Sequence, residues 1–518
     1  MELEAKILSL SSAKHTLSQN LMGIEKESLR VSAEGSISQD PHPKAYGSAL
    51  TNSTITTDFS EALIELVTPP FDSAEKVLKD LGNTEHFVYH HLPDDQRFWP
   101  ASMPCVVRGG SHIPIAQYGQ SNRGLMKTVY RQGLANRYGS VMQTIAGIHF
   151  NYSFSNDFWH AYQVLLESNE SPRDFIDSQY MGLIRNVVRN GWLIPYLFGA
   201  SGAVCKSFLK DYHKHKLEEF DKNTWYLPYA TSLRMGDIGY QNSQEDAVGV
   251  KANYNSLCHY THSLQAAMQT SCAEYEAIGL KKDGAYQQLN TNILQIENEY
   301  YASIRPKPKL NGIDKPLEAL SNNGIDYIEL RSLDINPLLT SGIDKSQIHF
   351  LEAFLLYCLL EESPAISTAE QFEIDNNDNI VAHHGRNPSL TLTKQGQPIS
   401  LKDWGWDIAE KIKSVSTLLS KSHEKNIRLI LERICNPELT PSATLLAMMT
   451  EQGDGFYQLT NKISLQNRED FSKRPVNKES FAQITQAVEK SLEEQNQIEQ
   501  SDNQSFDEFI AEYFSVNG

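Results

Sequence analysis

The sequence contains 518 residues, of which 40% are hydrophobic, and it has a formal net charge of -18 at pH 7. This length and hydrophobic content exclude a disordered chain and permit either one large domain or two to three smaller ones. The acidic balance repels nucleic acid and anionic membranes, so neither is expected as a partner.

The first residues include Glu2 and Glu4, where a secretory signal requires basic residues before an apolar run. The longest apolar stretch, 354–360, is bounded by Glu352 and Glu361 and is too short to cross a membrane. It predicts a buried helix instead. We expect a cytoplasmic protein, and we expect it to be a monomer.

The cysteines are far apart in the sequence and show no CxxC spacing, so they predict neither a zinc site nor a redox pair. In a reducing compartment such scattered cysteines are usually buried thiols, and we expect all of them to be reduced. They are Cys105, Cys205, Cys258, Cys272, Cys358 and Cys435.

Several segments in the first two thirds of the chain predict β-strands with polar side chains at every second position, which places these side chains on one face of a sheet. The segment 23–29 carries Glu25 and Glu27, and the apolar segment 62–67 carries Glu65 shortly after Asp58. A carboxylate in such an apolar strand needs a partner, because an unpaired buried charge is costly.

Three later segments show the same alternation. In 148–154, His149, Asn151 and Ser153 alternate with aromatic residues, and in 326–332, Tyr327, Glu329 and Arg331 alternate with Ile328 and Leu330. The segment 289–300 also reads as a strand, with Gln295, Glu297 and Glu299 on one parity, although the pattern does not decide which parity faces inward.

Any one of these strands is explained by a sheet with one face in water, but five together favour a site. Their acids and single imidazole suit a hard cation such as Mg²⁺ or Mn²⁺ better than structural zinc. Arginines offset the acidic charge and are able to hold a carboxylate or a phosphate through paired hydrogen bonds. The candidates are Arg131, Arg234, Arg305 and Arg331.

Other catalytic motifs are absent from the sequence. The segments 202–207 and 342–346 lack the glycine and the spacing of a P-loop, and no GxSxG, HExxH or GxGxxG occurs. The stretch from about 400 onward alternates helical patterns. Its polar tract 488–504 predicts a solvated helix or a mobile linker, where we do not expect chemistry.

Longer motifs resemble one known family. They are ITTDFSEALIE at 55–65, FWPASMPC at 98–105, YGQSN at 118–122 followed by Lys127, Tyr130 and Arg131, IPYLFGAS at 194–201, LPYATSLR at 227–234 and RSLDINP at 331–337. Together they are similar to the proteobacterial type of glutamate–cysteine ligase. The similarity is dense over about 20–340 and thins beyond about 345.

This resemblance implies an α+β, glutamine-synthetase-like fold, in which a curved, mainly antiparallel sheet forms half a funnel with helices packed outside. We expect a single catalytic body over 1–518, with the sheet and the site in about 20–345 and a mostly helical part in about 346–518. By similarity, the metal set consists of Glu25, Glu27, Asp58, Glu65, His149 and Glu329.

The resemblance also implies roles for residues around the substrates. Arg331, Arg234 and Arg131 are the expected catalytic residues, Tyr130, Asn151, Tyr240 and Tyr301 the substrate-binding residues, and Arg305 and Lys307 the residues that bind the nucleotide.

The implied reaction joins the γ-carboxylate of glutamate to the amine of cysteine at the expense of ATP, through a γ-glutamyl phosphate, with Mg²⁺ or Mn²⁺ bound. It is the first step of glutathione biosynthesis, so glutathione is a candidate feedback inhibitor. A carboxylate requires activation by ATP before an amine displaces its oxygen, and this route needs no protein nucleophile. The alternatives are another γ-glutamyl-amine ligase, a guanidino kinase of the same fold, or a non-catalytic sensor of glutamate or nucleotide.

Overall fold

The computed structural model describes residues 2–210, 212, 215–239, 251–310 and 315–515. Its centre is a seven-stranded sheet in which each strand runs antiparallel to its neighbours, in the order β11-β12-β5-β1-β3-β2, with β4 paired to the end of β1. The strands of this sheet are β1 Leu21–Ser32, β2 Ile55–Thr57, β3 Leu63–Val67, β4 Gln96–Phe98, β5 Ile148–Ser153, β11 Ile304–Lys307 and β12 Tyr327–Leu333.

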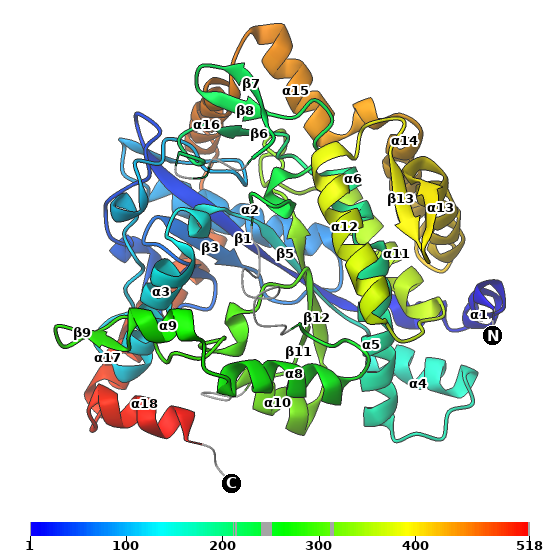
Figure 1. Cartoon of the computed structure of the whole chain (residues 1–518), viewed down its shortest axis with the longest axis horizontal. Coiled ribbons are helices and arrows are strands. Elements are labelled where there is room, and N and C mark those ends of the chain that lie inside the picture. Colours follow the sequence, from blue (N-terminus) through cyan, green and yellow to red (C-terminus); the bar gives the residue numbers. More distant parts are fainter. Residues whose placement is uncertain (1, 211, 213–214, 240–250, 311–314, 516–518) are drawn as a thin grey trace.

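Three smaller sheets and many helices surround it (Figure 1). The smaller sheets contain β6 Ala203–Cys205, β8 Thr224–Tyr226 and β7 Glu218–Asp221; β9 Lys281–Lys282 and β10 Ala285–Tyr286; and β13 Thr391–Lys394 and β14 Gln397–Ser400. The helices of the first two thirds are α1 Leu3–Leu10, α2 Ala74–His90, α3 Asn122–Tyr138, α4 Asn156–Leu165, α5 Pro172–Asn190, α6 Leu193–Phe198, α8 Leu257–Gln269, α9 Ala273–Ile278 and α10 Pro316–Asn323.

The last third of the chain is mostly helical. Its helices are α11 Lys345–Leu360, α12 Thr368–His384, α13 Leu401–Ser416, α14 Lys421–Cys435, α15 Pro441–Gln452, α16 Phe456–Ser472, α17 Lys478–Ser501 and α18 Phe506–Phe514. The chain is therefore a mixed structure of helices and antiparallel sheet, as expected.

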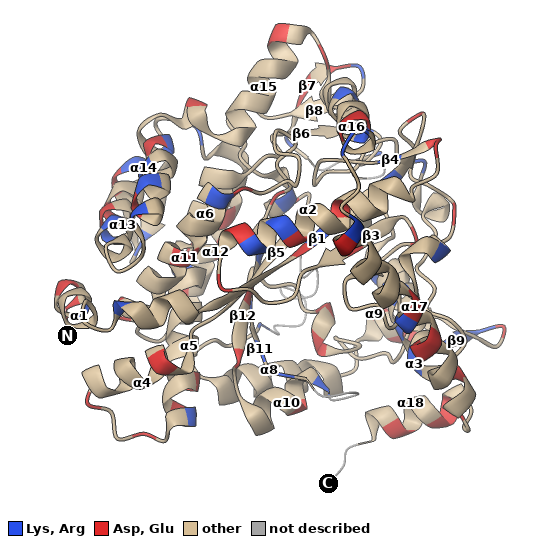
Figure 2. Cartoon of the chain, turned by 180° about the vertical axis from the view of Figure 1, so that it is seen from behind, with Lys and Arg blue, Asp and Glu red and all other residues tan. Residues whose placement is uncertain are grey.

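Four of the five predicted strand segments are confirmed as β1, β3, β5 and β12. Their apolar members, such as Ile24, Phe150 and Ile328, are fully buried on one face of the sheet. On that side α2 contacts β1 and β3, and α5 contacts β11 (Figure 2). The alternation of apolar and polar residues thus packs one face against helices and leaves the other face to polar side chains.

The prediction of a strand over 289–300 is wrong. Within the described chain this segment contains only an isolated bridge from Asn292 to Ser271 and a short 3₁₀ turn, Glu297–Glu299, and is otherwise irregular. The Gln295 side chain accepts from the Leu289 amide over 2.9 Å, and Asn290 Nδ2 donates to the Gln295 carbonyl over 2.9 Å. Such local side-chain bonds to the backbone compete with strand pairing.

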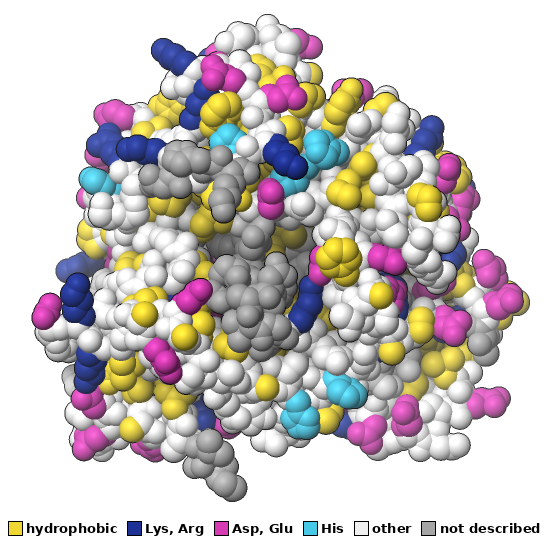
Figure 3. Space-filling view, viewed as in Figure 1, with side chains coloured by type: hydrophobic (Ala, Val, Ile, Leu, Met, Phe, Trp, Pro, Cys, Tyr) yellow, Lys and Arg dark blue, Asp and Glu magenta, His cyan; other side chains and the backbone are white. Residues whose placement is uncertain are grey.

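The apolar stretch 354–360 lies in α11, which is buried from Gln347 to its end at Leu360, so the prediction of a buried helix is confirmed. No helix in the described part of the chain is long and apolar enough to cross a membrane. On the face shown in Figure 3, the acidic and basic side chains of the described residues are interspersed.

The prediction that all cysteines are reduced is wrong for one pair. Cys105 and Cys205 form a disulfide, with Cα atoms 5.5 Å apart, whereas Cys258, Cys272, Cys358 and Cys435 are free. The bonded pair is separated by 100 residues, with Cys105 in the loop after β4 and Cys205 at the end of β6, so only the tertiary fold brings it together. A spacing rule for neighbouring cysteines cannot detect such a contact.

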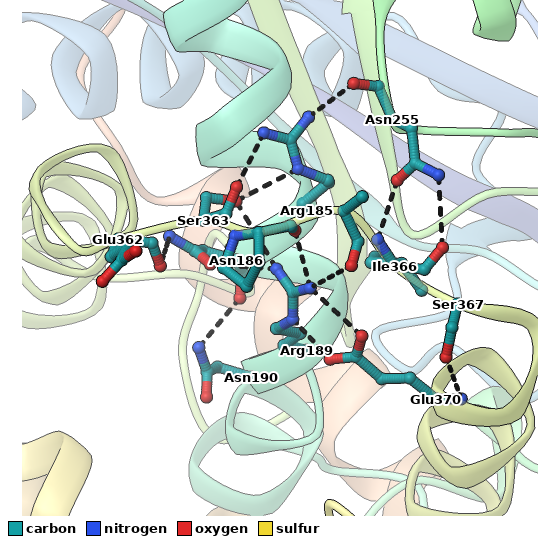
Figure 4. Close-up of polar contacts among 12 residues, drawn as sticks. Arg185, Asn186, Arg189, Asn190, Asn255, Glu362, Ser363, Ile366, Ser367 and Glu370 are labelled. Atoms are coloured by element: carbon teal, nitrogen blue, oxygen red, sulfur yellow. Dashed lines mark hydrogen bonds and ion pairs between the residues drawn. The ribbon is translucent and has the colours of Figure 1, made fainter.

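A polar network on α5 ties the catalytic part of the chain to its last third (Figure 4). Arg185 donates to the carbonyls of Tyr254 and Asn255 over 3.1 and 3.0 Å, and to the carbonyl of Ser363 over 2.9 Å. One turn further along α5, Arg189 forms an ion pair with Glu370 at 2.6 Å. Together they fix the connection between α11 and α12 against α5.

The helices α17 and α18 form what we call the C-terminal arm, residues 478–514, which lies beside α3 (Figure 1). The tract 488–504 is thus mainly a solvated helix, in line with the first of its two predicted forms. The expectation that this tract has no part in a site is wrong, because Ile498 and Ser501 line the cavity described below.

Candidate active site

A cavity of about 1230 Å³ lies over the polar face of the central sheet. All six side chains predicted as metal ligands line it, although they come from separate parts of the sequence. They are Glu25 and Glu27 of β1, Asp58 after β2, Glu65 of β3, His149 of β5 and Glu329 of β12.

Strand register brings these side chains together. Glu25 is paired with His149 across β1 and β5, and Glu27 is paired with Glu65 across β1 and β3. Paired residues of antiparallel strands point to the same face, and so do residues two apart on one strand. The register therefore places both glutamates of β1 beside their partners on the cavity wall.

The tightest group consists of Glu25, His149 and Glu329, whose candidate ligand atoms lie within 4.8 Å of one another. His149 Nδ1 is 3.1 Å from Glu25 Oε2 and 3.4 Å from Glu329 Oε1. His149 Nε2 is 3.8 Å from Glu27 Oε1. Three carboxylates thus surround one buried imidazole.

The electrostatic environment differs among these acids. Burial, followed by the charge of Asp58, raises the pKa of Glu27 to about 8. Burial and the neighbouring charges of Glu25 and Asp58 raise the pKa of Glu65 well above its usual value. Burial also opposes ionisation of Glu329, yet the charges of Arg331 and Lys307 outweigh it and hold the pKa of Glu329 well below its usual value.

The donor set fits a hard cation. Asn151 Oδ1 is buried and accepts no hydrogen bond, and Glu329 Oε2 also accepts none and has Lys307 Nζ at 3.4 Å as its ion-pair partner, although buried acceptors are normally hydrogen-bonded. A cluster of carboxylates that raise one another's pKa is relieved when a divalent cation binds. Asn151, which is paired with Glu329 in the sheet, donates to Glu25 Oε1 over 2.8 Å and so orients that carboxylate, although it does not itself line the cavity.

A second group, His349, Glu352 and His423, lies between α11 and α14, away from the cavity. Its two imidazole rings are stacked, with centroids 3.7 Å apart and planes 11° apart. The nitrogen lone pairs lie in the ring planes, so nearly parallel rings cannot both direct them at one ion. His423 instead pairs with Glu352 at 2.9 Å.

Two predicted arginines, Arg234 and Arg331, lie side by side on the wall. Arg234 Nη2 donates to the Arg331 carbonyl over 3.0 Å, and Arg331 Nη1 donates to Glu329 Oε1 over 2.7 Å. The Nε of each is buried without a hydrogen-bond partner. A Cβ on Gly147 would lie 2.1 Å from Arg234 Nη2, so a larger residue there would displace this guanidinium.

The predicted residues Tyr130 and Arg131 line the cavity from α3. Arg131 donates to the Asp58 carbonyl and to the Lys127 carbonyl, the latter over 3.0 Å, and its guanidinium stacks on Tyr118 at 4.6 Å. These contacts hold the guanidinium next to the acidic cluster.

The remaining predicted residues lie toward the β11 edge of the sheet. Tyr301 lines the cavity and donates to Met235 Sδ over 3.3 Å. Arg305 donates to the Asn298 carbonyl over 3.0 Å, and Lys307 Nζ lies 3.4 Å from Glu329 Oε2. Tyr240 lies outside the described residues.

Sequence reasoning missed several residues of this wall. Arg137 of α3 forms an ion pair with Glu299 at 2.9 Å, with both side chains fully buried. Asp237 lines the cavity and pairs with His383 Nε2 at 2.9 Å. Arg137 follows Lys127 and Arg131 in the same helical segment. This cluster of cations is the sequence signal by which Arg137 could have been predicted as a residue of the site.

The sequence model of the glutamate–cysteine ligase family matches residues 5–381. A glutamate–cysteine ligase of Pseudomonas putida is 45% identical over 518 residues, which cover 99% of this chain and 98% of that protein. The chain belongs to the glutamate–cysteine ligase family. The resemblance found in its motifs is thereby confirmed.

Other members of the glutamate–cysteine ligase family agree. A relative from Alcanivorax borkumensis is 42% identical over 524 residues, with 99% of each chain covered. The crystal structure of glutamate–cysteine ligase from Francisella tularensis in complex with AMP has a TM-score of 0.90 and 34% identity, covering 95% of this chain and 97% of that chain. A bifunctional glutathione synthetase from Pasteurella multocida, at 23% identity and a TM-score of 0.71, shares the fold over 90% of this chain and 54% of its own.

Proposed function

We propose that this chain joins the γ-carboxylate of L-glutamate to the amine of L-cysteine and that ATP is cleaved to ADP and phosphate in the same reaction. Membership of the glutamate–cysteine ligase family supports this reaction. The observation that carries the proposal is the convergence of six acidic and imidazole side chains with two partly unpaired arginines on one cavity wall.

The acidic cluster is proposed to hold Mg²⁺ or Mn²⁺. Glu25, His149 and Glu329 would form one part of the set, and Glu27, Asp58 and Glu65 the other. The bound cation supplies positive charge that offsets the phosphate oxygens.

In the first step, a γ-carboxylate oxygen of glutamate attacks the terminal phosphorus of ATP, and ADP leaves. The transferred phosphoryl group carries negative charge, which cationic hydrogen-bond donors stabilise in the transition state. Arg331 and Arg234, whose Nε atoms have no hydrogen-bond partner, are proposed to be these donors. Arg131, held beside Asp58, offers a third guanidinium.

In the second step, the cysteine amine attacks the acyl carbon of γ-glutamyl phosphate, the carbon–oxygen bond to phosphate breaks, and the amine loses a proton to a carboxylate of the wall. Tyr301 and Tyr130 are proposed to bound the substrates with aromatic rings, and Arg305 and Lys307 to contact the nucleotide. The wall contributes position and charge, in accord with a reaction that needs no protein nucleophile.

We propose that the central sheet is a half-funnel of the glutamine-synthetase type and that the chain forms a single catalytic body. One hydrophobic cluster that includes Leu3, Ile328 and Val488 supports the single body. A reaction that uses ATP and a cysteine whose thiol stays reduced is proposed to take place in the cytoplasm. Glutathione carries the same γ-glutamyl group as the product, which supports a role as feedback inhibitor.

An oxygen-transfer experiment tests the reaction. The protein is supplied with ATP, Mg²⁺, cysteine and glutamate labelled with ¹⁸O in the γ-carboxylate. Because one carboxylate oxygen leaves with the phosphoryl group, we expect the label in inorganic phosphate. Unlabelled phosphate would contradict an acyl phosphate, and equal ADP formation with other amines would favour a different γ-glutamyl-amine ligase.

A further inference from the structure

The C-terminal arm contributes a wall of the cavity for which neither the motifs nor the family model provides a role. The family model ends at residue 381, before the arm begins. The arm side chains that line the cavity include Ile498, Ser501, Asp502, Phe509, Glu512 and Tyr513.

Specific contacts fix the arm to the start of α3. Glu499 accepts from the Gln120 amide over 2.9 Å, and the Gln504 carbonyl accepts from Asn122 Nδ2 over 3.0 Å. Asp502 accepts from the Asn122 amide. Gly119 has a φ of 83°, and a Cβ there would lie 2.1 Å from Gln495 Nε2, so the turn before α3 is shaped to receive the arm.

Helix α3 connects the arm to the acidic cluster. Its first residue, Asn122, touches the arm, and Arg131 touches Asp58. Nine helical residues separate them, which corresponds to about 13 Å along the helix axis. An extended nucleoside triphosphate spans such a distance. Arg123, Lys127 and Arg131 line the cavity along this path.

The charges along the path distinguish its two ends. Phosphate groups require cations, which the middle of α3 provides, whereas the arm presents the carboxylates of Asp502 and Glu512. The amide of Asn122, at the N-terminus of α3, is already satisfied by Asp502 and is not free to bind phosphate. The arm is therefore unsuited to the phosphates.

The same wall is suited to an uncharged nucleoside. Phe509 and Tyr513 lie one turn apart on α18, are half-buried and have ring centroids 6.4 Å apart. Lys315 Nζ lies 5.2 Å from the centroid of the Tyr513 ring and helps to hold it. Aromatic rings stack on bases, and carboxylates accept hydrogen bonds from ribose hydroxyl and base amino groups.

We propose that the C-terminal arm forms the nucleoside end of the ATP site, with Phe509 and Tyr513 packing against the base and Glu512 accepting a hydrogen bond from the nucleoside. This assignment rests on the proposed use of ATP. It makes the arm a determinant of nucleotide affinity that is separate from the acidic cluster.

The test uses the full chain with Phe509→Leu and Tyr513→Leu, which remove the aromatic rings but keep apolar volume. AMP binding is measured by calorimetry without glutamate or cysteine, and KM values are measured by ADP formation. We expect AMP affinity to fall and the KM for ATP to rise about tenfold, because a stacked base contributes on the order of a tenfold effect or more. The KM values for glutamate and cysteine should stay within about twofold of the parent.

The matched control is Phe372→Leu, which alters an exposed ring of α12 outside the cavity and should change none of these values. Glu512→Gln is a second test variant, because Glu512 is exposed and its substitution does not disturb packing; a severalfold loss of AMP affinity is expected. Unchanged AMP affinity and KM for ATP in the folded variants would overturn the proposal. A parent that binds AMP yet forms no ADP with glutamate and cysteine would overturn the reaction instead, and AMP binding would still decide the role of the arm.

Discussion

Arg331 Nη1 donates to Glu329 Oε1 over 2.7 Å, and both side chains leave β12 toward the same cavity. The guanidinium thus holds a candidate metal ligand with one nitrogen while its Nε remains free for an anion. A single ammonium group cannot serve both positions, because it lacks the planar arrangement of donors.

We therefore expect Arg331→Lys to lower kcat by roughly 100-fold or more, in the range seen when a preorganised donor to a developing charge is lost. Steady-state ADP formation measures the effect. Arg173→Lys is the control, since Arg173 forms a partly buried ion pair with Asp177 on α5, outside the cavity, and its variant should retain full activity. Equal activity of both variants would contradict the assignment of Arg331.

Glu65→Gln is expected to abolish turnover with cysteine while the protein stays folded. The Glu65 carboxylate lies among Glu25, Glu27 and Asp58, so removal of its charge relieves repulsion when no cation is present. In EDTA the Tm of the variant should equal or exceed that of the parent, whereas the increase in Tm on adding Mg²⁺ should shrink. Parent-like turnover would refute the metal assignment.

Arg137 is expected to support structure rather than the reaction. Its ion pair with Glu299 is completely buried, and its guanidinium also stacks on Tyr275 at 4.0 Å. Arg137→Met leaves a buried carboxylate unpaired, which should lower the free energy of unfolding by about 3–5 kcal/mol. Urea denaturation provides the measurement, and the double variant Arg137→Met/Glu299→Gln should recover part of the loss. Full stability of the single variant would contradict this role.

The Cys105–Cys205 disulfide closes a loop with a sequence separation of 100. Alkylation in denaturant without reductant, followed by peptide mass spectrometry, should label the four other cysteines, two of which are buried in the folded chain, and leave this pair unlabelled. The double variant Cys105→Ser/Cys205→Ser should be less stable by about 2–5 kcal/mol, because the unfolded chain regains the entropy of the open loop. Six alkylated cysteines would exclude the bond.

Acid should destabilise the protein through buried histidines. Burial and the charge of Arg30 lower the pKa of His42 to about 4, and burial and His423 lower the pKa of His349 to about 4. The unfolded side chains titrate near pH 6.5, so between about pH 6.5 and 4 the unfolded state binds protons that the folded state does not. This stability is fully present above that window and is lost as the pH falls through it.

Urea denaturation at about pH 7 and about pH 4.5 measures the change. The parent should lose on the order of 1–3 kcal/mol per histidine, and His42→Gln should lose less than the parent. An identical loss in both proteins would mean that His42 does not contribute.

Local periodicity was sufficient to predict the sheet face of the site. Within each strand, polar residues such as Glu25, Glu27, His149 and Glu329 alternate with apolar ones, because successive side chains of a strand point to opposite faces of the sheet. This alternation can be read from a few consecutive residues. The pattern of 289–300 does not decide which residues face inward, and this segment does not form the predicted strand. Gln295 and Asn290 make hydrogen bonds to the backbone instead, and these bonds depend on the path of the loop.

Long-range contacts were beyond the sequence pattern. The partner of Cys105 lies 100 residues away, and Asp502 meets Asn122 across most of the chain. The spacing of Phe506, Phe509 and Tyr513 marks one helix face, but nothing in it shows what that face contacts. Only the packing of the arm on α3 resolves this point.

The attachment of the arm to Asn122 has a consequence for biosynthesis. The cavity wall combines β1 with α18, which follows it far along the chain and is therefore synthesised much later. A nascent chain is thus expected to lack one wall of the proposed nucleotide site until α18 has been synthesised and has docked on α3, and it should bind ATP less tightly before that point.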